Sequence, residues 1–351
     1  MKVWFAVVGV LLALSPMVRA DDNVGPYKVL KKVTVGGDGG WDYITVDPDN
    51  RKLYVSRGNR FDVFDADTLQ KVGEIDDTPG CHGVAIDPTS GHGFTTNRGD
   101  PSVTMFDIKT LKVIKKIPVT GGPDGIFFDP FTKRIFCESH RDPNETVIDS
   151  NDGTVLGTID LGGAPEQGAS DGAGHLYVNL ESTSEVVAVD PSAMKVTARY
   201  ALGGDGEGPS GMGLDAKNRR IFSCRGNATM EVLDADSGKI LATLPTGDGT
   251  DAGTFDPDTL EAFASNGNGT LTVVKEDSPS SFEVEQNVQT ARGARTCAFD
   301  AKTHDIYLVT AQFQAPATRP AAATTQEGAR PRRTRPRMIP GTFEIIVVGR
   351  Q

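Results

Sequence analysis

The sequence is poor in several residue types, and each scarcity excludes a class of protein. Its 351 residues include four cysteines and five histidines, and the cysteines show no CxxC spacing. A disulfide-stapled scaffold and a cysteine-rich zinc site are thereby excluded. We expect buried thiols at four positions, although an oxidising compartment would permit disulfides: Cys81, Cys137, Cys224 and Cys297.

Positive charge and long apolar runs are scarce as well. Lys and Arg number 36 against 47 Asp and Glu, which leaves a net charge of −11. Such a field repels phosphate backbones and anionic lipids, so nucleic acid is not an expected partner. Beyond residue 20 no apolar run reaches the ~20 residues that cross a bilayer, and no membrane insertion is expected. A small molecule or a protein is the expected partner of a monomeric chain.

The first twenty residues form a segment of their own. Lys2 precedes an apolar run from Val3 to Leu14, and a small-residue site ends at Ala20. This order predicts a cleavable signal peptide over residues 1–20, and hence a periplasmic or secreted protein. Its removal would lower the net charge to −13, because Lys2 and Arg19 leave with it.

What the remaining chain does contain is a repeat. A short apolar strand ending in Asp, then a turn, then two further strands recur seven times, at intervals of 40 to 44 residues. Periods of this length are typical of β-propellers, in which four strands make a blade. Apolar residues alternate or run in short β-branched stretches, with no helical period. The marker aspartates are Asp47, Asp87, Asp129, Asp171, Asp215, Asp256 and Asp300.

The two ends of the chain predict how the ring closes. The last unit stops after its third strand, at residues 343–348, while residues 29–37 resemble the fourth strand of another unit, at 113–122. We therefore predict one all-β domain over residues 21–351, a seven-bladed β-propeller with four-stranded blades. The N-terminal strand completes the last blade, so the ring has no open edge.

Two segments carry a resemblance to a known family. Leu53-Tyr54-Val55-Ser56-Arg57-Gly58-Asn59 and Phe94-Thr95-Thr96-Asn97-Arg98-Gly99 resemble the YVTN repeat, and the whole predicted mature chain resembles the exported YncE-like seven-bladed propellers. The resemblance implies a fold and an exported location. It implies no activity, because repeats of this type specify architecture and carry no agreed catalytic motif.

One segment interrupts the repeat in the last unit. Residues 315–340 are rich in Ala, Pro, Thr and Arg and stand where other units have a short turn between the second and third strands. Few of them could build a core, so a flexible insert is expected. Its arginines could guide an anionic partner or remain solvated.

Candidate site residues follow from the alignment of the units. In a propeller, the loops that lead into the innermost strands lie around one mouth of the channel, and loops on a rigid scaffold carry function. The residue five positions before each marker is polar in all seven units: Asp42, His82, Asp124, Glu166, Ser210, Asp251 and Arg295.

This seven-residue ring admits three interpretations. The carboxylates would suit a hard cation, and Asp42, His82 and Asp124 together would admit zinc or another transition metal. Asp and His could instead act as acid and base, with Arg295 stabilising an oxyanion. Asp or Ser at such positions also fixes turns through bonds to the backbone, which is a purely structural role.

A second set of polar residues follows each second strand and should surround the ring. It could bind a carboxylate or phosphate, or form ion pairs between blades. We call these residues the collar: Arg57, Asn97, Arg98, His140, Arg141, Glu181, Arg225 and Asn266. His92, His175 and His304 fall in turns at the opposite face and are expected to be solvated.

Three functions are compatible with this sequence. The favoured one is a binding protein that takes a small ligand, a metal ion or a partner protein at the mouth without turnover, because no nucleophile and base occur in a recognisable context. A lactonase-like hydrolase using the mouth Asp, His and Arg residues is the alternative, since some propellers that resemble this chain open lactone rings. Docking to a periplasmic redox enzyme is the third.

Overall fold

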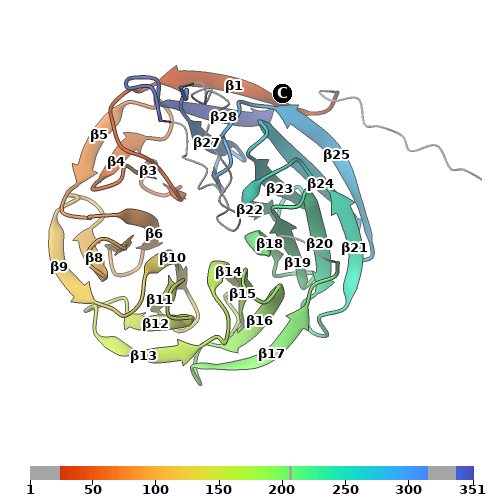
Figure 1. Ribbon diagram of the computed structural model, residues 1–351, viewed down its shortest axis with the longest axis horizontal. Helices are drawn as coiled ribbons and strands as arrows, with labels where there is room; N and C mark the ends of the chain where they lie inside the picture. Colours follow the sequence, from red (N-terminus) through yellow and green to blue (C-terminus); the bar gives the residue numbers. More distant parts are fainter. Residues whose placement is uncertain (1–23, 205–207, 315–336) are drawn as a thin grey trace, which may run out of the picture.

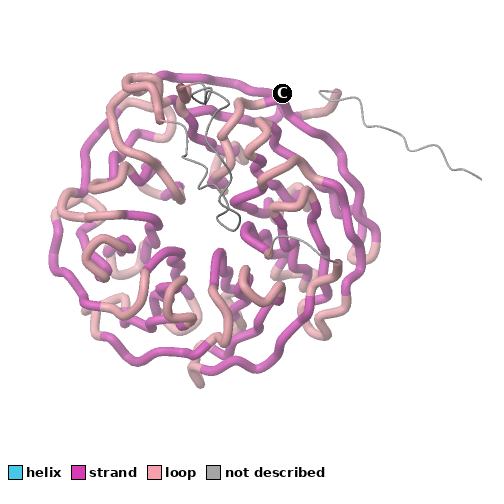
Figure 2. Tube along the Cα trace, in the orientation of Figure 1, coloured by secondary structure: helices cyan, strands magenta, loops and turns pink. Residues whose placement is uncertain are grey.

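The computed structural model describes residues 24–204, 208–314 and 337–351, and the predicted signal peptide lies outside them. These residues form 28 strands and no helix, in seven four-stranded sheets around a central axis (Figures 1 and 2). The predicted all-β, seven-bladed propeller is thus confirmed. Within the described part, no helix has the length and apolar character needed to span a bilayer.

Each blade is a meander whose first strand faces the axis and whose fourth lies at the rim (Figure 1). The first three blades are β2 to β5 (Ile44–Asp47, Lys52–Ser56, Phe61–Asp65, Lys71–Ile75), β6 to β9 (Cys81–Asp87, His92–Asn97, Ser102–Asp107, Val113–Pro118) and β10 to β13 (Pro123–Asp129, Arg134–Ser139, Asn144–Asp149, Val155–Asp160).

The next three blades follow in the same order. They are β14 to β17 (Pro165–Ser170, Leu176–Leu180, Glu185–Asp190, Lys195–Ala201), β18 to β21 (Pro209–Asp215, Arg220–Arg225, Thr229–Asp234, Ile240–Pro245) and β22 to β25 (Thr250–Asp256, Glu261–Asn266, Thr270–Ser278, Ser281–Gln289). The seventh blade contains β26 (Cys297–Phe299), β27 (Ile306–Thr310), β28 (Glu344–Arg350) and β1 (Tyr27–Thr34).

The seventh blade closes the ring as the sequence predicts. Strand β1 pairs antiparallel with β28, from Tyr27 opposite Arg350 to Thr34 opposite Glu344. Tyr27 is fully buried, and its backbone exchanges hydrogen bonds of 3.0 and 2.8 Å with the side chain of Gln286 in the sixth blade. The two ends of the chain therefore lie in one sheet and are tied to the neighbouring blade.

The core is divided among the interfaces between blades. Seven apolar clusters of described residues each combine the facing sides of two neighbouring blades, as Tyr54 and Phe106 do between the first and second. A flat meander buries its two faces only against other blades, so no blade has a core of its own. All four cysteines are buried and unbridged, which agrees with the expectation of buried thiols.

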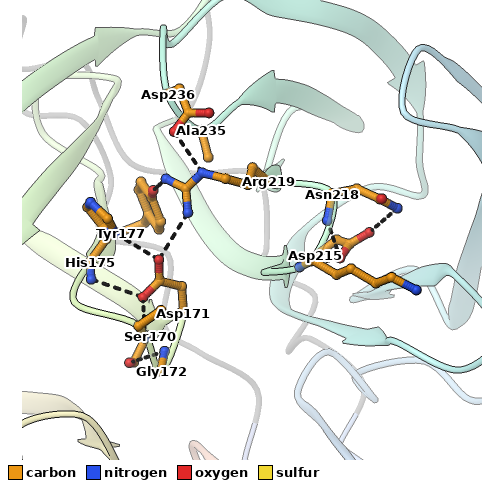
Figure 3. A network of polar contacts seen from close by, with 12 residues as sticks. Ser170, Asp171, Gly172, His175, Tyr177, Asp215, Asn218, Arg219, Ala235 and Asp236 are labelled. Atoms are coloured by element: carbon orange, nitrogen blue, oxygen red, sulfur yellow. Dashed lines mark hydrogen bonds and ion pairs between the residues drawn. The ribbon is translucent and has the colours of Figure 1, made fainter.

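The marker aspartates hold the turns at the face opposite the mouth. Each accepts backbone amides two or three residues further on, as Asp47 does from Asp49 and Asn50 at 3.1 and 3.0 Å. In four of them the second oxygen contacts a neighbouring blade: Asp87, Asp171, Asp256 and Asp300. Figure 3 shows Arg219 of the fifth blade reaching Asp171 of the fourth at 3.0 Å, while it also contacts Tyr177 and Asp236.

Two of the histidines predicted to be solvated belong to the same system of contacts. His304 lies 3.0 Å from Asp256 of the preceding blade, and His92 lies 3.0 Å from the carbonyl of Ser150 in the following blade. Both are half-buried, so the expectation of solvated side chains is wrong for them. His175 is exposed and contacts Asp171 at 2.9 Å (Figure 3).

The predicted insert does lie between the second and third strands of the last blade. Its main part, residues 315–336, lies outside the described residues. Its two ends pair: Gln314 N donates to Arg337 O and Ile339 N donates to Gln312 O, both at 2.8 Å. Residues 337–339 thus form an ordered neck, and the sequence placed the end of the flexible insert too late, at residue 340.

Candidate functional site

The inner strands begin with β-bulges that direct the ring residues at the channel mouth. In β6, β10, β14, β18 and β22 the pairing register shifts within the first residues of the strand. A bulge adds one residue and changes the direction in which its side chain points. His82, Asp124, Glu166, Ser210 and Asp251 each lie within such a shift, so the alignment selected positions with a common geometry.

His82 occupies the centre of a three-blade cluster. Its Nδ1 contacts Asp42 of the first blade and lies 3.0 Å from Asp124 of the third. The second oxygen of Asp124 pairs with Arg98. Donor atoms of Asp42, His82 and Asp124 lie within 4.8 Å of one another, close enough to hold one metal ion. The same nitrogen lies between two carboxylates, and Arg98 supplies a positive charge to this acidic pair.

A second cluster lies in the third and fourth blades. His140 Nδ1 is 3.2 Å from Glu166, and its Nε2 is 3.8 Å from Glu181. The contact with Glu166 raises the pKa of His140 above its usual value, which favours the imidazolium form. Tyr43 of the first blade reaches across and donates to the other Glu166 oxygen at 3.2 Å.

The remaining ring residues lie in the last three blades and contact their neighbours. Arg295 pairs with Asp251 at 2.9 Å, and Ser210 Oγ donates to the carbonyl of Thr250 at 2.8 Å. Desolvation raises the pKa of Asp251 to about 7, Arg295 opposes this rise, and the carboxylates of Asp42 and Glu166 add to it. The carboxylates of the ring therefore influence one another across the mouth, while the Ser210 hydroxyl joins the fifth blade to the sixth.

Two side chains that the sequence analysis overlooked narrow the channel beneath this ring. Four positions before the marker, other units have Gly83, Gly125 or other small residues, but the first and fourth units have Tyr43 and Gln167. Gln167 spans to the backbone of the fifth and sixth blades, accepting from Gly253 N at 3.2 Å and donating to Gly253 O at 2.9 Å. The sequence did contain a signal for these two side chains, because each is a bulky residue at a repeat position where the other units have small ones.

The channel contains a cavity of about 430 Å³ with a buried acid in its wall. Glu138 is fully buried, and neither carboxyl oxygen has a hydrogen-bond partner among the described residues. The Glu138 side chain has room because two glycines face it. A Cβ on Gly125 would lie 1.8 Å from one Glu138 carboxyl oxygen, and a Cβ on Gly168 would lie 2.5 Å from the other. Desolvation raises its pKa well above the usual value, as do the charges of Glu145 and Glu166, so Glu138 is held neutral.

The collar does not form the exposed cationic surface that one interpretation required. Arg57 and Arg225 are about 1% exposed. Arg57 donates to the carbonyl of Asp38 at 2.7 Å and its guanidinium lies 3.6 Å above the Phe343 ring. Arg225 donates to the carbonyl of Gly203. Both arginines fasten the loops that lead into their own blades, and their guanidinium groups are buried there and not displayed on the surface of the mouth. Ligand binding by these two residues stays a prediction.

The other collar residues divide into two groups. Asn97 and Asn266 are buried and bond hydroxyls of their own blades, at 3.0 Å to Ser102 and 3.0 Å to Thr270. Arg98, His140 and Glu181 join the ring clusters described above. Arg141 is exposed and lies against Gly122. Sequence position alone did not separate these groups, because burial depends on the neighbouring loop.

Comparisons with known proteins support the fold and go no further. No family model and no curated protein matches the sequence. Among solved structures the chain is similar to hydrazine synthase from Kuenenia stuttgartiensis, with a TM-score of 0.68 and 18% identity over 79% of this chain and 94% of that chain. At this identity the likeness establishes the propeller architecture alone.

Proposed function

We propose that this protein is an exported binding propeller of the YncE-like kind, whose channel mouth holds a small ligand or a divalent metal ion without turnover. The observation that supports this function is the triad of Asp42, His82 and Asp124, contributed by three consecutive blades. A site assembled from three blades exists only where those blades are folded against one another. Binding at the triad would therefore report on the native propeller.

The donor set favours a transition metal over calcium. One imidazole nitrogen and two carboxylates match the protein ligands that zinc accepts, whereas calcium takes six to eight oxygens. Arg98 engages one oxygen of Asp124, so that carboxylate would bind through its other oxygen only. His82 must be neutral to act as a ligand, and metal binding would displace its proton.

The test is zinc binding to the purified protein, measured by calorimetry and by thermal shift. We expect one zinc site that is lost in His82→Ala and Asp124→Asn. His175→Ala is the matched control, because His175 is exposed at the opposite face and belongs to none of the groups of described residues close enough to hold a metal ion. Zinc binding that survives His82→Ala, or no binding of zinc, nickel or small carboxylates, would refute the proposal.

The same preparation separates binding from hydrolysis. A panel of lactones is added and acid release is followed. Binding without acid release supports the binding protein. Turnover that disappears in Asp124→Asn would instead establish the lactonase-like alternative, with His82 and Asp124 as its acid and base.

A further inference from the structure

An aromatic-lined pocket lies beside the acidic ring, at the mouth end of the seventh blade. Its volume is about 1130 Å³, just above the ~300 to 1,000 Å³ usual for ligand sites. Three parts of the chain form its walls. They are Trp41 in the loop before β2, the loop before β26, and Phe313 with its bridge partner Met338 of the neck. No ring residue except Arg295 takes part, so this pocket is separate from the triad.

The apolar wall is held in place from below. Trp41 lies between two rings, with centroids 5.3 Å away at Phe343 and 5.8 Å away at Phe313. Phe343 is buried, with the Arg57 guanidinium 3.6 Å over its face. Phe313 ends this stack and is 42% exposed. A rigid, partly exposed aromatic surface offers a stacking platform for a planar ligand.

The rim of the pocket is cationic in an otherwise acidic mouth. Arg292 and Arg295 line it together with a single acid, Glu344. Arg295 shares its charge with Asp251. Arg292 is exposed and forms no ion pair with any described residue. A planar guanidinium whose donors are not engaged by any described residue matches a carboxylate or sulfonate.

We propose that this pocket binds a planar aromatic anion, with its ring body against Trp41 and Phe313 and its carboxylate or sulfonate on Arg292. The acidic ring next to the pocket would repel the same anion, so Arg292 fixes the ligand's orientation with the charged end at the rim. The proposal concerns residues outside the metal triad and holds whether or not that triad binds zinc.

Gly40 gives a test that leaves the fold intact. It lines the pocket, its φ is not positive, and a Cβ built on it meets nothing within 4 Å. Gly40→Leu should therefore place an apolar side chain in the pocket beside Trp41 without strain. In a chain beginning at residue 21, Trp41 is the sole tryptophan, so intrinsic emission reports on this pocket.

The probes are 1-naphthoate and the cationic 1-naphthylmethylamine, titrated by calorimetry while Trp41 emission is followed. We expect 1-naphthoate to bind and to change the emission, with affinity reduced about tenfold or more in Gly40→Leu and in Arg292→Glu. Lys217→Glu, at the opposite face, makes the same change in net charge and should have no effect. Melting curves check that each variant is folded.

Three outcomes would overturn the proposal. They are no binding of 1-naphthoate to the wild-type chain, equal binding of the cationic probe, and unchanged binding by Gly40→Leu. Zinc titrations of Gly40→Leu keep the two sites distinct. That variant should retain the Asp42, His82 and Asp124 site, so loss of naphthoate binding with zinc binding intact identifies the aromatic pocket.

Discussion

At the scale of single residues, the third blade carries an unusual pair of acids. Glu138 and Glu145 face each other across β11 and β12, and both are fully buried without hydrogen-bond partners among the described residues. At the position of Glu138, the first and second blades have the hydroxyls of Ser56 and Thr96, which donate to the backbone carbonyls of Tyr43 and Asp124 near the start of inner strands. A neutral carboxyl can take the place of a hydroxyl there, whereas an ionised one cannot.

Glu145→Gln tests this pair. Desolvation raises the pKa of Glu145 to about 8, so the folded state retains a proton that the unfolded state loses between about pH 4.5 and pH 8. Wild-type stability should fall by about 1.4 kcal/mol per pH unit across that window from this group alone. The variant should lose this slope and become the more stable form at pH 8 in urea unfolding.

The control for that experiment is Glu283→Gln, which removes the same charge from an exposed position on β25. It should leave the slope unchanged. If Glu145→Gln shows the wild-type slope, the carboxyl is ionised in the folded protein and the account of this pair is wrong.

At the scale of elements, strand β1 connects the seventh blade to the sixth and joins the two ends of the chain. It covers the rim of the seventh blade, and its Tyr27 hydroxyl donates to the buried Glu261 in the sixth blade. The ring packs only through neighbouring blades, so an opening at one place exposes two apolar faces.

Removal of β1 should therefore destabilise the entire propeller. A chain beginning at residue 36 should melt more than about 10 °C below one beginning at residue 24, which retains the strand, because both a rim strand and a blade interface are lost. Calorimetry measures the difference. Equal melting temperatures would show that closure by β1 contributes nothing to stability.

At the scale of the whole molecule, two opposing sets of carboxyl groups determine how stability depends on pH. Desolvation raises the pKa values of Asp251, Glu276 and Glu285 to about 7. Among the marker aspartates the pKa of Asp87 is lowered, because the Ser150 hydroxyl and backbone amides outweigh its burial. The pKa of Asp171 is lowered as well, because hydrogen bonds from His175 and Arg219 outweigh its burial.

Stability should peak near about pH 5 and fall on both sides. Above this pH the folded state holds protons on the raised carboxyls that the unfolded chain has lost, so stability falls as pH rises toward 8. Below it the unfolded chain protonates its aspartates first, so stability falls in acid. Urea unfolding from about pH 3 to about pH 9 measures the profile. A maximum above neutral pH would contradict the assignment of the buried acids.

Most of the fold could be predicted from the repeat, because the signals of the repeat act between residues that are close in the sequence. Strand alternation, marker aspartates and turn residues recur every 40 to 44 residues, and each acts within its own blade. The number of blades, closure by residues 29–35 and the seven ring positions could therefore be predicted. The bulges that direct the ring residues follow the same period.

What only the tertiary structure decided depends on contacts between blades. Three features join residues far apart in the chain: the contacts that place His82 between Asp42 and Asp124 while Arg57 is buried, the reach of Tyr43 and Gln167 across the channel, and the row of rings that ends at Phe313. The position of a residue in the repeat determines where its Cα lies in the blade. What it contacts, and whether it is hydrated, depends on residues in neighbouring blades, which vary independently of the repeat.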